Sequence, residues 1–139
     1  MVDDLLDAFK TANAATESNV PYEDFSHTVS ELGSAIDTFY RDVSRGNIQL
    51  DLSTENMINE LFLDYENAKD LWSTKFSGQA RRSGLKERLI KRYPGIGQED
   101  RIYVDKGISF IFSTAQNKFQ KLNELLKTPW EVEESLRAR

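Results

Sequence analysis

The sequence predicts an all-α protein, a single-domain helical bundle of about five helices plus a short C-terminal helix. Apolar residues recur three and four positions apart through most of the 139 residues, which is the period of an α-helix with one buried face. Gly, Pro, Ser and Asn gather in the short stretches between these patterns, where helices are expected to end. The hydrophobic content of 39%, with eight Phe, five Tyr and two Trp, is enough to build one core in a chain of this length.

The first two helices are expected over residues 2–17 and 21–44. A turn over Ser18–Pro21 separates them, and Pro21 suits the first turn of a helix because its missing N–H has no partner there. The apolar stripe of the first helix comprises Leu5, Leu6, Phe9 and Ala12. The stripe of the second comprises Phe25, Val29, Leu32, Ile36, either Phe39 or Tyr40, and Val43.

A third helix is expected over residues 53–76 and a shorter fourth helix over residues 84–93. Asp51 or Ser53 can cap the start of the third helix. Its apolar face is broad, as in a central bundle helix, and comprises Met57, Ile58, Leu61, Phe62, Tyr65, Ala68, Leu71, Trp72 and Phe76. The fourth helix has basic residues on most sides, and its apolar residues are Leu85, Leu89, Ile90 and Tyr93.

The fifth helix is expected over residues 99–127. Its stripe comprises Val104, Ile108, Ile111, Ala115, Phe119, Leu122 and Leu126. Residues 101–112 are also rich in strand-forming side chains, so a strand is an alternative there. Thr128, Pro129 and Glu131 then match a capping box with proline at the first helical position. This pattern predicts a separate helix to about residue 138, which is too short to be stable unless it docks on the body or on a partner.

The composition excludes several classes of site. The absence of cysteine removes disulfides, thiolate nucleophiles and cysteine-ligated zinc, and a single histidine argues against histidine-rich metal centres. We therefore expect no metal, no cofactor and no enzymatic activity. No apolar run approaches the roughly 18 residues of a membrane span, and the acidic start at Asp3 and Asp4 differs from a signal peptide. A cytoplasmic or host-cell interior location is expected.

A basic block is the strongest functional signal in this acidic chain. Between Lys75 and Arg92 lie seven of the eighteen basic residues and one acid, Glu87, so the block carries +6 and the rest of the chain −11. Such an asymmetry is typical of a surface for an anionic partner, or of one pole of a self-associating protein. The candidate partner-binding residues are Arg81, Arg82, Lys86, Arg88, Lys91 and Arg92.

Two aromatic residues are candidate hydrophobic anchors for the same partner. Phe110 is expected to point away from the apolar stripe and to be exposed, and Trp130 lies in the short C-terminal helix. The sequence thus predicts a non-enzymatic protein–protein interaction domain, such as an adaptor, effector, inhibitor or assembly subunit. Its arginine-rich segment, residues 81–92, would engage an acidic surface on a protein partner or on another copy of the chain.

The turn over Pro94–Gly97 supplies an alternative function. Its Gly95 and Gly97 flank a hydrophobic residue, and the turn resembles that of helix-hairpin-helix DNA-binding motifs. The resemblance covers residues 84–108 and implies that backbone N–H groups of the turn bind a nucleic-acid phosphate, with the basic block adding attraction. This sequence departs from the motif at Arg101, where the family has a small residue. It also places acids at Glu99 and Asp100.

His27 supplies a third hypothesis. It is expected to face solvent on the second helix, and a solvent-facing histidine on a small acidic helical domain resembles the histidine phosphotransfer domains. That resemblance implies that His27 accepts a phosphoryl group. Those domains favour a lysine and a glycine three and four residues later, where this chain has Ser30 and Glu31.

Carboxylates on the third helix are expected to form a solvated surface opposite its apolar face. They are Glu55, Glu60, Asp64, Glu66 and Asp70. Glu60 and Asp64 are four residues apart, so an acid–base pair or a metal site is the alternative there.

Overall fold

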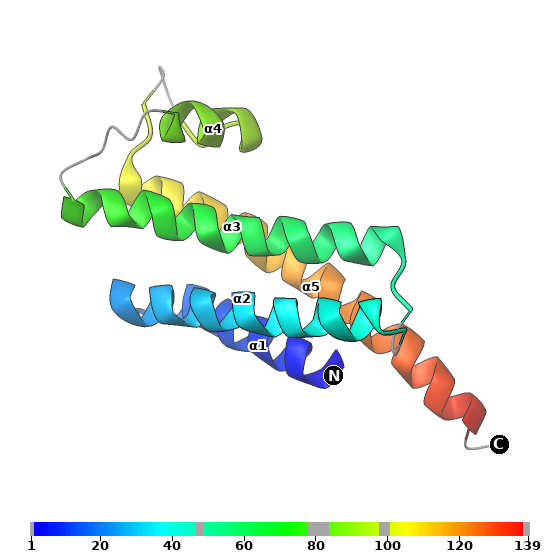
Figure 1. Cartoon of the computed structure of the whole chain (residues 1–139). Helices are drawn as coiled ribbons and strands as arrows, with labels where there is room; N and C mark the ends of the chain where they lie inside the picture. Colours follow the sequence, from blue (N-terminus) through cyan, green and yellow to red (C-terminus); the bar gives the residue numbers. More distant parts are fainter. Residues whose placement is uncertain (1, 47–48, 78–83, 98–100, 138–139) are drawn as a thin grey trace.

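The computed structural model is an up-and-down helical bundle (Figure 1). It describes residues 2–46, 49–77, 84–97 and 101–137, with side chains described as far as Leu126. Within these residues the elements are α1 (Val2–Glu17), α2 (Tyr22–Ser44), α3 (Leu52–Ser77), α4 (Leu85–Arg92) and α5 (Val104–Arg137). The predicted all-α fold class is confirmed.

Four long helices form the body of the bundle, and α4 lies outside it. Helix α3 packs against α5 and α2, while α1 packs against α2 and α5, so each long helix has two neighbours. Consecutive long helices run in opposite directions, and α4 belongs to the connection between α3 and α5 and lies over α3 (Figure 1). This is the up-and-down arrangement that short connections favour.

Most residues of the apolar stripes read from the sequence form or border the core, but Phe76 of the α3 stripe is 68% exposed, so its assignment to the buried face is wrong. All four residues of the α1 stripe are buried, as are Phe25, Val29, Leu32 and Ile36 on α2. The sequence left open whether Phe39 or Tyr40 belongs to the α2 stripe, and in the structure the buried residue is Phe39. Tyr40 is half-buried, and its hydroxyl donates a hydrogen bond of 2.8 Å to Asn59 Oδ1.

The last helix differs from the prediction at both ends. It begins at Val104 rather than near residue 99. The strand alternative for residues 101–112 is wrong, because residues 104–112 are helical and no strand occurs among the described residues. It then continues to Arg137 across Thr128 and Pro129, so the separate C-terminal helix is also wrong. Inside a helix a proline removes one backbone hydrogen bond and its ring crowds the carbonyl four residues earlier, at a cost of about 3 kcal/mol or more, which is why the local pattern predicted a break here.

Gly107 lies in the segment for which a strand was considered, and its role is in helix packing. A Cβ atom at this position would lie 2.7 Å from Leu71 Cδ2 and 2.8 Å from Ile102 Cγ2. The glycine therefore allows α5 to approach α3 closely, and its presence here reflects this close packing of two helices rather than a low preference for helix.

None of the helices within the described residues has the length and apolar character needed to cross a membrane.

Candidate partner-binding site on helix α4

Helix α4 has one apolar side, which it buries on the bundle. Leu85, Leu89 and the following Tyr93 are 7%, 0% and 3% exposed. Gly84 precedes the helix with φ +93°, a conformation that favours glycine, and its carbonyl accepts the N–H of Arg88 at 2.9 Å. A helix of eight residues is too short to be stable alone, so this burial holds it in place.

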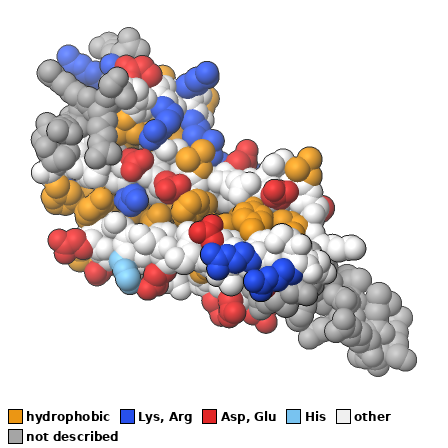
Figure 2. Space-filling view, viewed as in Figure 1, with side chains coloured by type: hydrophobic (Ala, Val, Ile, Leu, Met, Phe, Trp, Pro, Cys, Tyr) orange, Lys and Arg blue, Asp and Glu red, His pale blue; other side chains and the backbone are white. Residues whose placement is uncertain are grey.

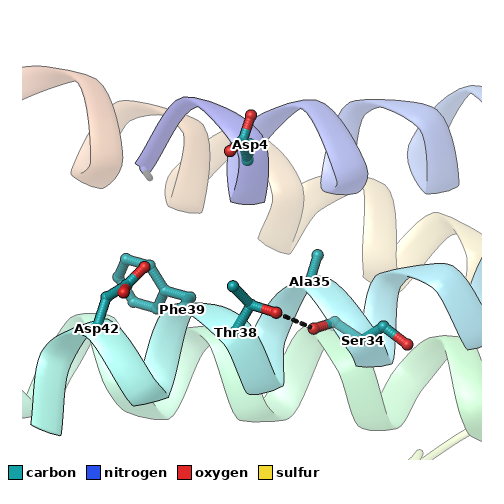
Figure 3. A pocket seen from close by; sticks show the side chains of 6 residues that line it. All are labelled: Asp4, Ser34, Ala35, Thr38, Phe39 and Asp42. Carbon is teal, nitrogen blue, oxygen red and sulfur yellow. Dashed lines mark hydrogen bonds between the residues drawn. The ribbon is translucent and has the colours of Figure 1, made fainter.

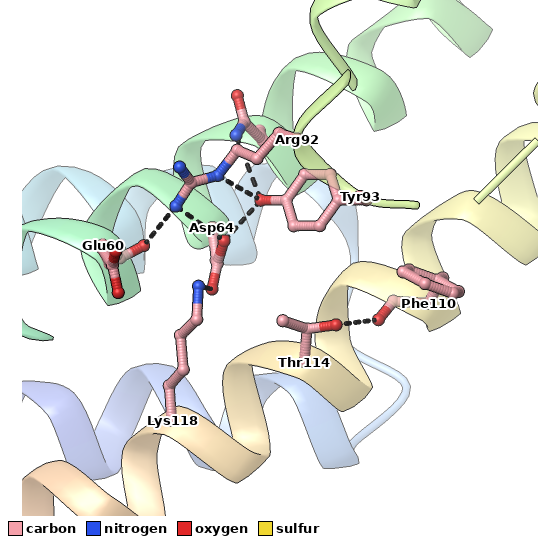
Figure 4. A network of polar contacts seen from close by, with 8 residues as sticks. Glu60, Asp64, Arg92, Tyr93, Phe110, Thr114 and Lys118 are labelled. Carbon is pink, nitrogen blue, oxygen red and sulfur yellow. Dashed lines mark hydrogen bonds and ion pairs between the residues drawn. The ribbon is translucent and has the colours of Figure 1, made fainter. Parts of the chain in front are cut away.

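A buried carboxylate fixes the C-terminal end of α4. Asp64 of α3 is 0% exposed, and the hydroxyl of Tyr93 donates a hydrogen bond of 2.5 Å to its Oδ1 (Figure 4). Two cations complete the site: Arg92 Nη2 lies 3.3 Å from Oδ1, and Lys118 Nζ of α5 lies 2.9 Å from Oδ2. Asp64 therefore ties α3 to both α4 and α5. We call Asp64, Arg92, Tyr93 and Lys118 the Asp64 cluster.

Two further hydrogen bonds support the cluster. Asn67 Nδ2 donates to the Tyr93 oxygen at 3.1 Å, and Arg92 Nη2 donates to the main-chain carbonyl of Glu60 at 3.2 Å. Burial of the Tyr93 phenol, reinforced by its hydrogen bond to Asp64, raises its pKa to about 12. The phenol therefore remains a neutral donor to Asp64 over the ordinary pH range.

The burial of Asp64 corrects the sequence analysis, which placed it on a solvated face. Helix α4 and Lys118 cover this side of α3, whereas the Glu60 side chain is exposed. Glu60 and Asp64 thus lie in different environments and do not form the acid–base pair considered above. Among the described residues no group of three or more His, Asp or Glu side chains could hold a metal ion.

A pattern in the sequence could have identified Asp64. It lies three residues after Leu61 and four before Ala68, and both are 0% exposed. The carboxylate is therefore in phase with the apolar stripe of α3. A charged residue in that phase is either a break in the stripe or a buried group with partners. The partners lie 28 to 54 residues further along the chain, so spacing alone does not reveal them.

The basic block divides into two sets of residues. In the first set the cations pair within the chain: Lys75 with Asp105, Arg88 with Asp70 at 3.4 Å, and Arg92 with Asp64. In the second set, Lys86 and Lys91 are exposed on α4 without an ion-pair partner among the described residues. Arg81 and Arg82 lie outside the described residues. Lys86, Arg88 and Lys91 are the exposed basic residues of α4, and they lie around its solvent-exposed sides together with the exposed acid Glu87; we call these three basic residues the α4 basic face.

The predicted aromatic anchors have different outcomes. Phe110 is half-buried rather than exposed, and its ring packs edge-on against Tyr93 with centroids 6.4 Å apart, so the expectation of an exposed side chain is wrong. The reason is that Tyr93 and the turn after α4 pack against this part of α5. Trp130 lies within the helical part of α5, and its side chain is outside the described residues.

The Pro94–Gly97 turn is shaped by packing. Gly95 has φ +91°, and a Cβ atom on Gly97 would lie 2.6 Å from the carbonyl oxygen of Arg101. Ile96 between them is buried, and its N–H already bonds to the Tyr93 carbonyl at 3.0 Å. Helix α5 begins at Val104 rather than directly after the turn. Both glycines therefore have structural roles, and phosphate binding by this turn stays a prediction.

His27 faces solvent, as predicted. Its Nε2 lies 2.7 Å from Oε1 of Glu31 on the next turn of α2, and both side chains are largely exposed. The carboxylate that the sequence placed near the imidazole is thus in direct contact with it. Phosphoryl acceptance by His27 stays a prediction.

A pocket between α1 and α2 was not expected from the sequence. It has a volume of about 300 Å³ and is lined by Asp4, Ser34, Ala35, Thr38, Phe39 and Asp42 (Figure 3). Two carboxylates from different helices line it, which no spacing within one helix would reveal.

Comparison with models of known protein families, with curated proteins and with solved structures found no match for this chain.

Proposed function

We propose that the protein is a non-enzymatic interaction domain whose α4 basic face binds an acidic surface on a protein partner. The two-sided character of α4 is the observation that carries this proposal. Its apolar side is buried on the bundle, whereas its solvent side exposes three basic residues, Lys86, Arg88 and Lys91, against one acid, Glu87. Lys86 and Lys91 have no ion-pair partner among the described residues, so an acidic partner can engage them without breaking existing pairs.

The Asp64 cluster supports this role because it holds α4 in position before a partner arrives. Arg92 and Tyr93 at the end of α4 are bonded to Asp64, and Arg88 is paired with Asp70 of α3. A helix that is already fixed loses little conformational freedom on binding, and this favours affinity. Exposed lysines on a fixed helix would then steer an acidic surface towards it.

The charge of the rest of the molecule favours a protein partner over a duplex. Residues 2–44 contain nine carboxylates against Lys10 and Arg41, which gives this part of the chain a net charge of −7. Nucleic-acid binding depends on neutralising several phosphates with positive side chains. A strongly acidic body would repel the phosphates around a small basic face, whereas an acidic patch on a protein can be limited to the area of α4.

The test is affinity capture from the native host with a charge-reversed variant, K86E/K91E. The matched control is K10E/K121E, which makes the same change in net charge at exposed lysines on α1 and α5. We expect proteins captured by the wild type and by the control to be lost with K86E/K91E, and to be released as salt is raised. Equal capture by all three forms would contradict the proposal.

A second measurement separates a protein partner from nucleic acid. Duplex DNA is titrated into the wild type at low salt. Binding that weakens steeply between about 50 mM and 200 mM salt and disappears in K86E/K91E would favour the nucleic-acid alternative. Under the present proposal no such binding is expected.

A further inference from the structure

The α1–α2 hairpin is the acidic counterpart of the α4 basic face. Eight of its nine carboxylates belong to exposed residues and Asp42 is half-buried. The exposed ones are Asp3, Asp4, Asp7, Glu17, Glu23, Asp24, Glu31 and Asp37. Figure 2 shows several basic side chains around α4, whereas acidic side chains are spread over the whole visible face and continue along the opposite edge, where basic side chains are also present.

The geometry of the bundle keeps these two surfaces apart within one chain. Helix α4 lies over α3 on one side, and the α1–α2 hairpin forms the other side, with α3 between them (Figure 1). Asp64 and Asp70 of α3 hold α4 in that position. The two oppositely charged surfaces can therefore meet only when they belong to different molecules.

The pocket on the hairpin offers a seat for a lysine ammonium group. The carboxylates of Asp4 and Asp42 border it, together with the hydroxyls of Ser34 and Thr38 (Figure 3). Both hydroxyls donate to backbone carbonyls of α2, at 3.3 Å and 3.1 Å, so their oxygens remain acceptors. An ammonium group carries three donors, which matches a site lined by carboxylate and hydroxyl oxygens.

We infer that the acidic partner is a second copy of this chain, whose α1–α2 hairpin receives the α4 basic face, with Lys86 or Lys91 directed into the pocket. This inference rests on the proposed function and names its partner. The contact is head-to-tail, because different surfaces of the two molecules meet. It depends mainly on exposed charges, so we expect weak association that decreases as salt is raised.

Charge reversal on each surface in turn provides the test, with mass measured by sedimentation velocity at low salt. The wild type is expected to show a concentration-dependent increase in mass, which both K86E/K91E and D37K/D42K abolish. A mixture of the two variants is expected to recover association, because the acidic α4 of one then matches the basic hairpin of the other. The control E66K/E124K reverses two acids outside the hairpin and should behave as the wild type.

The outcomes also separate this inference from the proposed function. A wild type that stays monomeric at every concentration would overturn the inference, and so would a mixture that fails to recover association. If K86E/K91E nevertheless loses a different protein in the capture experiment, the proposed function holds without self-association. If the wild type associates and K86E/K91E associates equally, α4 is not the contact and this inference is wrong. Equal capture of other proteins by that variant would then also remove the proposed function.

Discussion

Replacing Asp64 by asparagine tests the central feature of the structure, the buried anchor of α4. The substitution keeps the shape of the side chain and removes its charge. Arg92 and Lys118 then lack the carboxylate that they share. Their side chains are only 26% and 22% exposed, so water replaces that carboxylate poorly. Removing one member of a buried ion pair destabilises a protein by about 3–5 kcal/mol. The partial exposure of both cations places the expected loss near the lower end, about 3 kcal/mol.

The assay is urea unfolding of D64N followed by circular dichroism, with E60Q as the matched control. Glu60 lies one turn earlier on α3 with an exposed side chain, so E60Q is expected to change the free energy of unfolding by less than about 0.5 kcal/mol. Native-state hydrogen exchange adds a local readout. The N–H groups of Arg88 and Tyr93, which bond within α4, should lose more protection in D64N than those of α1.

A double-mutant cycle identifies the partner responsible. R92M preserves much of the aliphatic stem of Arg92 and removes its charge, so the coupling between D64N and R92M is expected to be about 1 kcal/mol or more. A loss in D64N no larger than that in E60Q would refute the proposed role of the carboxylate. Additive effects of D64N and R92M would show that Arg92 is not an energetic partner of Asp64.

Three further predictions concern packing, pH and the surface. G107A should destabilise by about 1–3 kcal/mol in urea unfolding because its Cβ would overlap Leu71. G33A on α2, whose Cβ would lie 3.2 Å from Phe62 Cζ of α3, should be milder or neutral. The stability that Tyr93 contributes is complete below pH 10, where its phenol is neutral in both states. It should fall by about 2–3 kcal/mol as pH rises from 10 towards 12, since the unfolded chain ionises first, and Y93F should flatten this part of the pH profile. R88A should change the unfolding free energy by less than about 1 kcal/mol, because its ion pair is half exposed; a larger loss would show that α4 depends on it.

The helices were predictable because apolar residues spaced three and four apart form the side of each helix that is buried. Apart from the half-buried Val43, the stripes on α1 and α2 identify residues that are buried in the structure, and Leu85 and Leu89 do the same for α4. The end of α5 was not predictable from local rules. Thr128 and Pro129 carry a helix-start pattern, and a proline inside a helix is unfavourable, so local rules predict a break that the continuous helix does not contain.

The candidate site was predictable only in part, because its contacts join distant segments. The segment that forms α4 and its basic character were read from the sequence, but the role of each charge was not. Asp64 was assigned to the solvated side of α3, although its phase with Leu61 and Ala68 matches the buried side. Phe110 was assigned to the surface because its contact with Tyr93, seventeen residues earlier in the chain, could not be foreseen from its neighbours.

The arginines of α4 have a different role in the structure from the one that the sequence predicted. In the sequence they favoured recognition of carboxylates on a partner, since guanidinium groups suit close pairs with carboxylates. In the structure Arg88 and Arg92 do recognise carboxylates, but those of the same chain, Asp70 and Asp64. Lys86 and Lys91 remain for an external partner, and ammonium groups are strongly hydrated, so such a contact should form quickly and be sensitive to salt. Tight binding that persists at high salt would have to use a different surface.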